Sequence, residues 1–147
     1  MDRPWVIADK TSEPLAAVEA LHTREGGLLA RSLLYDLVAD DVEWYVLGSP
    51  DVLPWAGTFR GKDGVRRWME TLDEHMEYER FELLELFADG DTVIEIVLAG
   101  GHARVTGRSF ESEVVRIWSF REGKAVRVRS FYDTGAYARA LLESSPS

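Results

Sequence analysis

The sequence contains no cysteine and only three histidines, His22, His75 and His102. The absence of thiols excludes disulfide bonds, a cysteine nucleophile and thiolate-bound zinc or iron–sulfur sites. No two of the histidines are spaced so that both would lie on one face of a helix or a strand. We therefore expect no bound metal and no cofactor.

Long hydrophobic runs and positive charge are also scarce. No stretch approaches the ~20 apolar residues that span a bilayer, and residues 1–10 lack the apolar core of a secretory signal, so we expect a cytoplasmic chain without a membrane partner. Lysine and arginine number 17 against 26 acidic residues, for a net charge of −9. Such a field repels phosphate backbones, so nucleic acid is not an expected partner.

The composition that remains is typical of a globular protein. Of the 147 residues, 46% are hydrophobic and 29% are charged. This length and balance predict a single domain over residues 1–147, with an N-terminal extension at 1–11 and a frayed tail at 143–147.

Three helices are predicted in the first half of the chain. Ser12 followed by Pro14 is typical of a helix start, and the glycines at 26 and 27 end that helix. A second helix is expected over about 28–39 and a third over about 62–76. Apolar residues recur at the helical period along the third helix: Val65, Trp68, Met69, Leu72 and Met76.

After residue 77 the pattern changes to the alternation and turns of strands. Together with an earlier short strand, the expected strands are 42–46, 78–87, 92–104, 110–121 and 124–132. Asp133 and Thr134 can cap a final helix. The turn-rich segment 47–61 is long enough to form a lid or the rim of a pocket. Helices followed by consecutive antiparallel strands predict an α+β domain whose bent sheet is covered by helices, leaving a cavity.

Four stretches carry a family resemblance. They are Leu37–Trp44 (LVADDVEW), Ala56–Val65 (AGTFRGKDGV), Phe120–Lys124 (FREGK) and Ser130–Thr134 (SFYDT). They resemble the SnoaL-like, ketosteroid-isomerase-related members of the nuclear transport factor 2-like superfamily, and the likeness covers nearly the whole chain. The resemblance implies a cone-shaped, curved antiparallel or mixed sheet of about four to six strands. It also implies three N-terminal helices on the concave face, an apolar central pocket, and a homodimer formed through the outer sheet face.

The catalytic positions of this family carry over poorly. Isomerases of the family have a base carboxylate on the first strand, where this chain has residues 44–46, Trp-Tyr-Val. Their acid corresponds to Arg116, and their helix-one tyrosine falls near Ala17 or His22. Epoxide hydrolases of this fold need an aspartate where Ser130 stands, and an Arg-x-Asp on an earlier strand that here is apolar. The fold alone therefore leaves the activity open among isomerase, cyclase, lyase, epoxide hydrolase and a protein without chemistry.

The hairpin between the last two strands decides which side chains face the cavity. A three-residue loop, Arg121–Gly123, would place Arg116 opposite Val128 on the pocket face. A two-residue turn would set Arg116 beside Arg129, but it requires a positive φ at Glu122, which is unfavourable for this residue type. We favour the first register.

On that register Arg116 is buried, and a buried guanidinium needs an acceptor from the protein or from a ligand. One hypothesis is that Arg116 binds an enolate, carbonyl or carboxylate oxygen of an aromatic or polycyclic substrate. The alternative is an outward Arg116 in an ion pair with Glu95 or Glu113.

The candidate catalytic residues are Arg116, His102 and Asp133. His102 follows two glycines that could bulge the strand, so its direction is open between the pocket and the surface. Asp133 has a second interpretation as a helix cap. Apolar and aromatic residues with a few polar ones are typical of small-molecule sites. The substrate-binding candidates are Trp44, Val46, Trp55, Trp68, Trp118, Val128, Ser130 and Tyr132.

These features predict a small-molecule-binding protein. The first hypothesis is a cofactor-independent isomerase, cyclase or lyase that transfers protons on a hydrophobic, polyketide- or steroid-like carbonyl compound. The second is a non-catalytic ligand-binding or dimerisation module of the same fold, and the third is an epoxide hydrolase. In each case the expected partners are a hydrophobic small molecule and a second copy of the chain.

Overall fold

The computed structural model describes residues 6–7, 12–23 and 31–142. Most of the predicted N-terminal extension, the glycines at 26 and 27, the start of the second predicted helix and the tail at 143–147 lie outside these residues. The elements in chain order are β1 (Val6–Ile7), α1 (Glu13–Thr23), α2 (Arg31–Leu37), β2 (Val38–Val46), β3 (Gly57–Arg60), α3 (Gly61–His75), β4 (Met76–Asp89), β5 (Thr92–Ala103), β6 (Ser109–Arg121), β7 (Lys124–Tyr132) and α4 (Thr134–Leu141).

The strands form one sheet in the order β1-β4-β5-β6-β7-β2-β3. Strands β4 to β7 pair in antiparallel fashion, whereas β1 runs parallel to β4 and β2 runs parallel to β7. The α+β fold with a curved mixed sheet is therefore confirmed. The sheet has more strands than the four to six expected, because β1 and β3 were not predicted.

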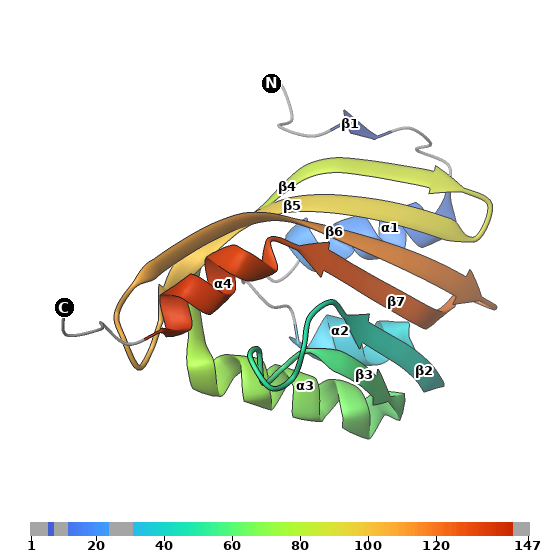
Figure 1. The fold of residues 1–147 in the computed structure, drawn as a ribbon. Coiled ribbons are helices and arrows are strands. Elements are labelled where there is room, and N and C mark those ends of the chain that lie inside the picture. The colour runs from blue at the N-terminus through green and yellow to red at the C-terminus, as the bar shows by residue number, and fades with distance from the viewer. Residues whose placement is uncertain (1–5, 8–11, 24–30, 143–147) are drawn as a thin grey trace, which may run out of the picture.

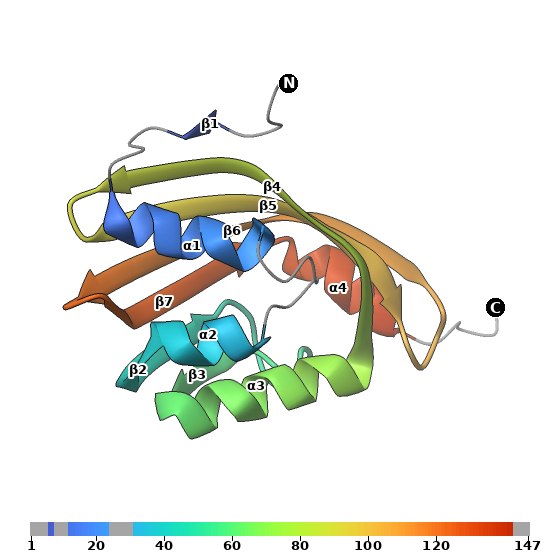
Figure 2. The ribbon, with the colours of Figure 1, turned by 180° about the vertical axis from the view of Figure 1, so that it is seen from behind.

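Helices α1, α2 and α3 lie on the concave side of the sheet, and α4 lies against one end of it (Figures 1 and 2). The amphipathic pattern of helix α3 explains its position on the sheet. Its other side is charged, and its buried residues are Gly64, Val65, Trp68, Met69 and Leu72. Helix α1 begins as expected, since the Leu15 amide donates to Ser12 Oγ at 3.1 Å. The core lies between this helical layer and the inner face of the sheet.

The bend of the sheet is built into strand β4. Its pairing with β5 shifts register twice, between Tyr78 and Arg80 and between Leu83 and Glu85. An extra residue on one strand bends the ladder and increases its twist. At the first shift the two backbones approach so closely that a Cβ on Gly101 would lie 1.9 Å from the carbonyl oxygen of Glu77. Glycine is therefore required at position 101, and the curvature that it permits opens a hollow beneath the sheet.

The β6–β7 hairpin corrects the predicted register. Arg121 pairs with Lys124 across a two-residue turn, and Glu122 adopts a positive φ of 52°. The register then shifts between Ser119 and Phe120, so that Arg116 lies opposite Ser130 rather than Val128. The favoured three-residue loop is wrong, yet Arg116 still faces inward, because the bulge reverses the facing that the short turn alone would produce.

Candidate functional site

A cavity lies between the inner face of the sheet and helix α3. Its walls come from β2, the loop before β3, α3, β4, β6, β7 and α4. The lining residues are Val46, Trp55, Trp68, Leu72, Tyr78, Phe81, Val114, Arg116, Ser130, Tyr132 and Tyr137. The site is therefore mainly aromatic and aliphatic with a few polar groups, as is typical of small-molecule pockets.

The cavity is narrow. It contains about 440 Å³ of atom-free space, part of it open to solvent, but the centre of a water molecule can reach only about 40 Å³ of it. That volume suits roughly two or three water molecules. The walls as they stand are therefore too close together for a polycyclic molecule, and even a slender single-ring molecule would require them to move apart.

Aromatic hydroxyl groups supply much of the polarity at the α4 end. The indole of Trp55 donates to Tyr132 Oη at 3.1 Å, and the hydroxyls of Tyr78 and Tyr137 lie 3.0 Å apart. Burial raises the pKa of Tyr78 to about 12 and also raises the pKa values of Tyr132 and Tyr137. These phenols stay protonated near neutral pH and act as hydrogen-bond donors rather than bases.

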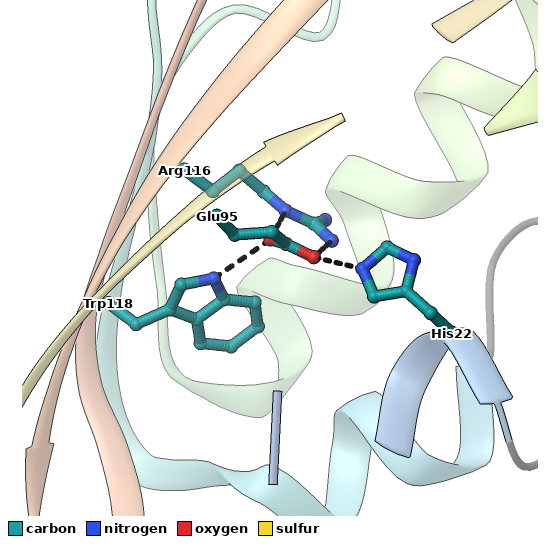
Figure 3. A network of polar contacts seen from close by, with 4 residues as sticks. All are labelled: His22, Glu95, Arg116 and Trp118. Carbon is teal, nitrogen blue, oxygen red and sulfur yellow. Dashed lines mark hydrogen bonds and ion pairs between the residues drawn. The ribbon is translucent and has the colours of Figure 1, made fainter. Parts of the chain in front are cut away.

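The second polar group of the cavity is Arg116, which is held in place by the buried carboxylate of Glu95 (Figure 3). Arg116 Nε donates to Glu95 Oε1 at 2.5 Å and Nη2 donates to Glu95 Oε2 at 2.9 Å, which makes a two-pronged ion pair. The indole of Trp118 donates to the same Oε1 at 3.0 Å. His22 Nε2, from helix α1, contacts Glu95 Oε2. Every oxygen of Glu95 is therefore satisfied, although its side chain is fully buried.

The charge state of Glu95 follows from these contacts. Burial alone would raise the pKa of Glu95, but the charge of Arg116 and the hydrogen bonds from His22 and Arg116 outweigh burial. They hold the pKa of this carboxyl well below its usual range. Glu95 is thus ionised at neutral pH and offsets the charge of Arg116.

Arg116 also lines the cavity and has one nitrogen, Nη1, that the pair with Glu95 does not use. Its guanidinium lies over the rings of Phe81 and Trp118, 5.2 and 5.3 Å from their centroids, and its side chain is only 7% exposed. The pair with Glu95 uses Nε and Nη2, and no residue in the described part of the chain hydrogen-bonds Nη1. Ser130, opposite Arg116 on β7, lines the cavity beside it.

The structure brings six of the predicted site residues to the cavity: Val46, Trp55, Trp68, Arg116, Ser130 and Tyr132. Three others lie behind the wall in the core. Trp44 packs on Trp68 at 4.7 Å between ring centroids and edge-on to Trp118 at 6.1 Å, and Val128 pairs with Trp118 across the sheet. These three support the wall without lining it.

His102 and Asp133 lie away from the cavity. His102 follows the regular β5–β6 pairing onto the outer face, where Nδ1 is 3.5 Å from Glu79 Oε1. The extra residue of the register shift lies on β4, opposite the two glycines, so β5 keeps its alternation. Asp133 accepts a hydrogen bond from the Ala136 amide at 3.0 Å and caps α4. Neither is brought together with Arg116.

The network around Arg116 was only half foreseen. Glu95 was named as a partner for an outward Arg116, whereas the pair faces inward. A signal was present, because Glu95 lies at the same alternating positions of the strand as the apolar Val93 and Val97, and so on the same face. His22 had no local signal, since it meets Glu95 across 73 residues. The cavity residues Tyr78, Phe81 and Tyr137 were also missed.

Two features of the described residues bear on the expected partners. No group of three or more acidic, histidine or cysteine side chains among them is arranged to hold a metal ion. No helix in the same residues is long and apolar enough to cross a membrane.

The comparisons with known proteins agree with this architecture. The family model for the SnoaL-like domain matches residues 16–128, so the chain belongs to the SnoaL-like family. An NTF2-like protein from Burkholderia thailandensis is 30% identical, with a TM-score of 0.75 over 88% of this chain and 97% of that one. An NTF2-like protein from Burkholderia pseudomallei is 24% identical, with a TM-score of 0.76 over 88% and 98%.

A third structure is similar in fold alone. It is a Mesorhizobium loti protein, provisionally named a SnoaL-like polyketide cyclase, at 17% identity with a TM-score of 0.69 over 84% of this chain and 99% of that one. A comparison with curated proteins found no match.

Proposed function

We propose that this protein binds a slender hydrophobic carbonyl compound in the cavity and acts on it as a cofactor-independent isomerase, cyclase or lyase. The observation that carries the proposal is the free Nη1 donor of a buried, rigidly paired arginine in an aromatic cavity. A donor held in place before the substrate arrives stabilises negative charge that develops on an oxygen, because little reorganisation is then needed.

The reaction class follows from which charges the site can stabilise. Isomerisation, aldol-type cyclisation and elimination next to a carbonyl all pass through an enolate. Arg116 supports the enolate oxygen, and the protonated hydroxyl of Tyr132 lies in the same cavity as a further donor. None of the described lining residues is an aspartate, a glutamate or a histidine. The proton of the substrate therefore moves through water or through a group of the substrate itself.

That missing base favours a second candidate function. A SnoaL-like protein with the same cavity and no proton acceptor can bind a carbonyl compound without changing it. The two functions share the ligand and differ only in turnover.

One experiment separates the two functions without knowledge of the product. Small aryl ketones are added in D₂O, and NMR follows the exchange of the protons next to the carbonyl. If the protein is an enzyme, these protons should exchange faster with the wild type than without protein. If it is a binding module, the ketone should bind without faster exchange. The matched control is the double variant Glu95→Gln/Arg116→Met, which removes the donor and its counter-charge together. An unchanged exchange rate or affinity in this variant would remove Arg116 from the site.

A further inference from the structure

The buried ion pair also bears on which kind of oxygen the cavity accepts, an inference that rests on the proposed carbonyl-binding function. Arginine at a ligand site ordinarily favours carboxylates and phosphates, because both carry full negative charge. Here a glutamate lies against the same guanidinium at 2.5 and 2.9 Å. The first question is therefore how much positive charge the cavity retains.

The balance of charge at the site is close to zero when the imidazole of His22 is neutral. Arg116 contributes one positive charge and the ionised Glu95 one negative charge, and both are buried. The remaining contacts of Glu95 are the neutral indole of Trp118 and the imidazole of His22. The described lining residues add hydroxyl, aromatic and aliphatic groups but no second cation. A ligand therefore meets hydrogen-bond donors without a net positive field.

A neutral oxygen and a carboxylate respond differently to such a site. A ketone oxygen needs only a donor, which Arg116 Nη1 supplies. A carboxylate would lose its hydration on entering an apolar cavity and would share one guanidinium with Glu95. The carboxylate of the ligand and that of Glu95 would then lie on the same guanidinium in a poorly screened site. Their repulsion is strong enough to lower the affinity by roughly tenfold or more.

We propose that Glu95 determines specificity: by neutralising Arg116, it makes the cavity select an uncharged oxygen acceptor such as a ketone and reject a carboxylate. Trp118 and Phe81 contribute by enclosing the pair, because their rings keep water from screening the repulsion. Glu95 is a positioning and charge-setting residue, since it reaches the ligand only through Arg116.

The test uses acetophenone and benzoate, which share one ring and differ in the charge of the oxygen group. Their dissociation constants are measured by NMR titration of the tryptophan indole N–H signals, since Trp55 and Trp68 line the cavity and Trp118 lies on Glu95. The titrations are made at pH 8, above the range in which imidazoles ordinarily gain a proton. We expect wild-type protein to bind acetophenone at least roughly tenfold more tightly than benzoate.

The variant Glu95→Gln keeps the shape and the acceptor oxygen but releases the charge of Arg116. We expect its benzoate affinity to rise at least roughly tenfold, with a much smaller change for acetophenone. The control variant Glu113→Gln removes the same charge from the exposed side of β6, and we expect it to leave both affinities unchanged. This control separates the effect of the charge at Glu95 from the effect of changing the net charge of the protein by one.

The outcomes distinguish the two proposals. Benzoate binding to wild type as tightly as acetophenone would overturn the role of Glu95 and leave carbonyl binding at Arg116 standing. Binding of neither compound would overturn the proposed function, and this inference with it. Unchanged benzoate affinity in Glu95→Gln would also overturn the role of Glu95. If that variant does not fold, equal wild-type affinities for the two compounds would still overturn it.

Discussion

On strands β5 and β6, the face toward the helices carries the charged Glu95 and Arg116, whereas the face toward the outside carries the half-buried Ile94, Ile96 and Ile117. At these positions both faces depart from the pattern expected for a sheet with one face in water, although the rest of the inner face is mainly apolar. The inner charges are tolerated because each is paired and hydrogen-bonded. The outer isoleucines have no comparable cover within the described chain. We therefore propose a ligand site on the inner face and a docking surface on the outer face.

The largest expected effect comes from removing one partner of the ion pair between Glu95 and Arg116. Arg116→Met leaves Glu95 buried without its cation, and we expect a loss of about 3–5 kcal/mol of unfolding free energy. The double variant Glu95→Leu/Arg116→Met removes both charges, and we expect it to stay within about 1 kcal/mol of wild type or to exceed it. Urea denaturation followed by circular dichroism measures both.

The outer face supplies a control for that experiment. Ile117→Met, on the neighbouring position of β6, keeps a large apolar side chain outside the cavity and should cost less than about 1.5 kcal/mol. Equal losses in Arg116→Met and in the double variant would show that packing, rather than charge pairing, explains the effect.

The second effect is the loss of unfolding free energy at low pH. The folded pKa of Glu95 lies below its unfolded value, so its contribution to stability is fully present above the unfolded pKa of about 4.3 and is lost as the pH falls toward the folded value. Below about pH 4.3 the wild type should lose unfolding free energy more steeply than the Glu95→Leu/Arg116→Met variant. The extra slope is about 1.4 kcal/mol per pH unit, as for one proton. Parallel slopes from pH 4.3 to 2.5 would contradict the assigned charge state.

The third effect tests the outer face. We propose that it pairs with the same face of a second copy, because an apolar surface on central strands is complementary to itself across a two-fold axis. Light scattering after size exclusion should give twice the 16.6 kDa chain mass for wild type and the single mass for Ile96→Lys. Val105→Lys, at a side chain that is 66% exposed in the β5–β6 turn, should remain dimeric. A monomeric wild type would end this proposal.

Much of the fold could be predicted because long periodic segments determine it. Helix α3 and strand β7 were expected within one residue of their observed bounds, since the apolar side chains that define their periods are the ones that are buried. Strand β3 was not predicted within segment 47–61. It is four residues long and its pairing depends on β2, so its own sequence carries too short a pattern to indicate a strand.

The candidate site was less predictable because its parts meet only in three dimensions. The inward direction of Arg116 was predicted, but from a three-residue loop that is wrong; a two-residue turn followed by a bulge in β7 produces the same facing. Strict alternation along β5 would have placed Glu95 on the inner face. The contact between His22 and Glu95 joins a helix end to a central strand, and only the packing of α1 on the sheet creates it.

The smallest expected effect lies at the turn that sets the two faces of β6. Glu122 has a φ of 52° and Gly123 a φ of 80°, which is the pattern of a turn that favours asparagine followed by glycine. Glu122→Asn should therefore raise the unfolding free energy by about 0.5–1 kcal/mol, because asparagine adopts positive φ at a lower cost. Thermal denaturation measures this gain. The indole signal of Trp118 should not move, since the turn keeps its length and Arg116 keeps its direction. A stabilised variant with a shifted Trp118 signal would mean that the turn residue, and not the bulge, determines which face Arg116 occupies.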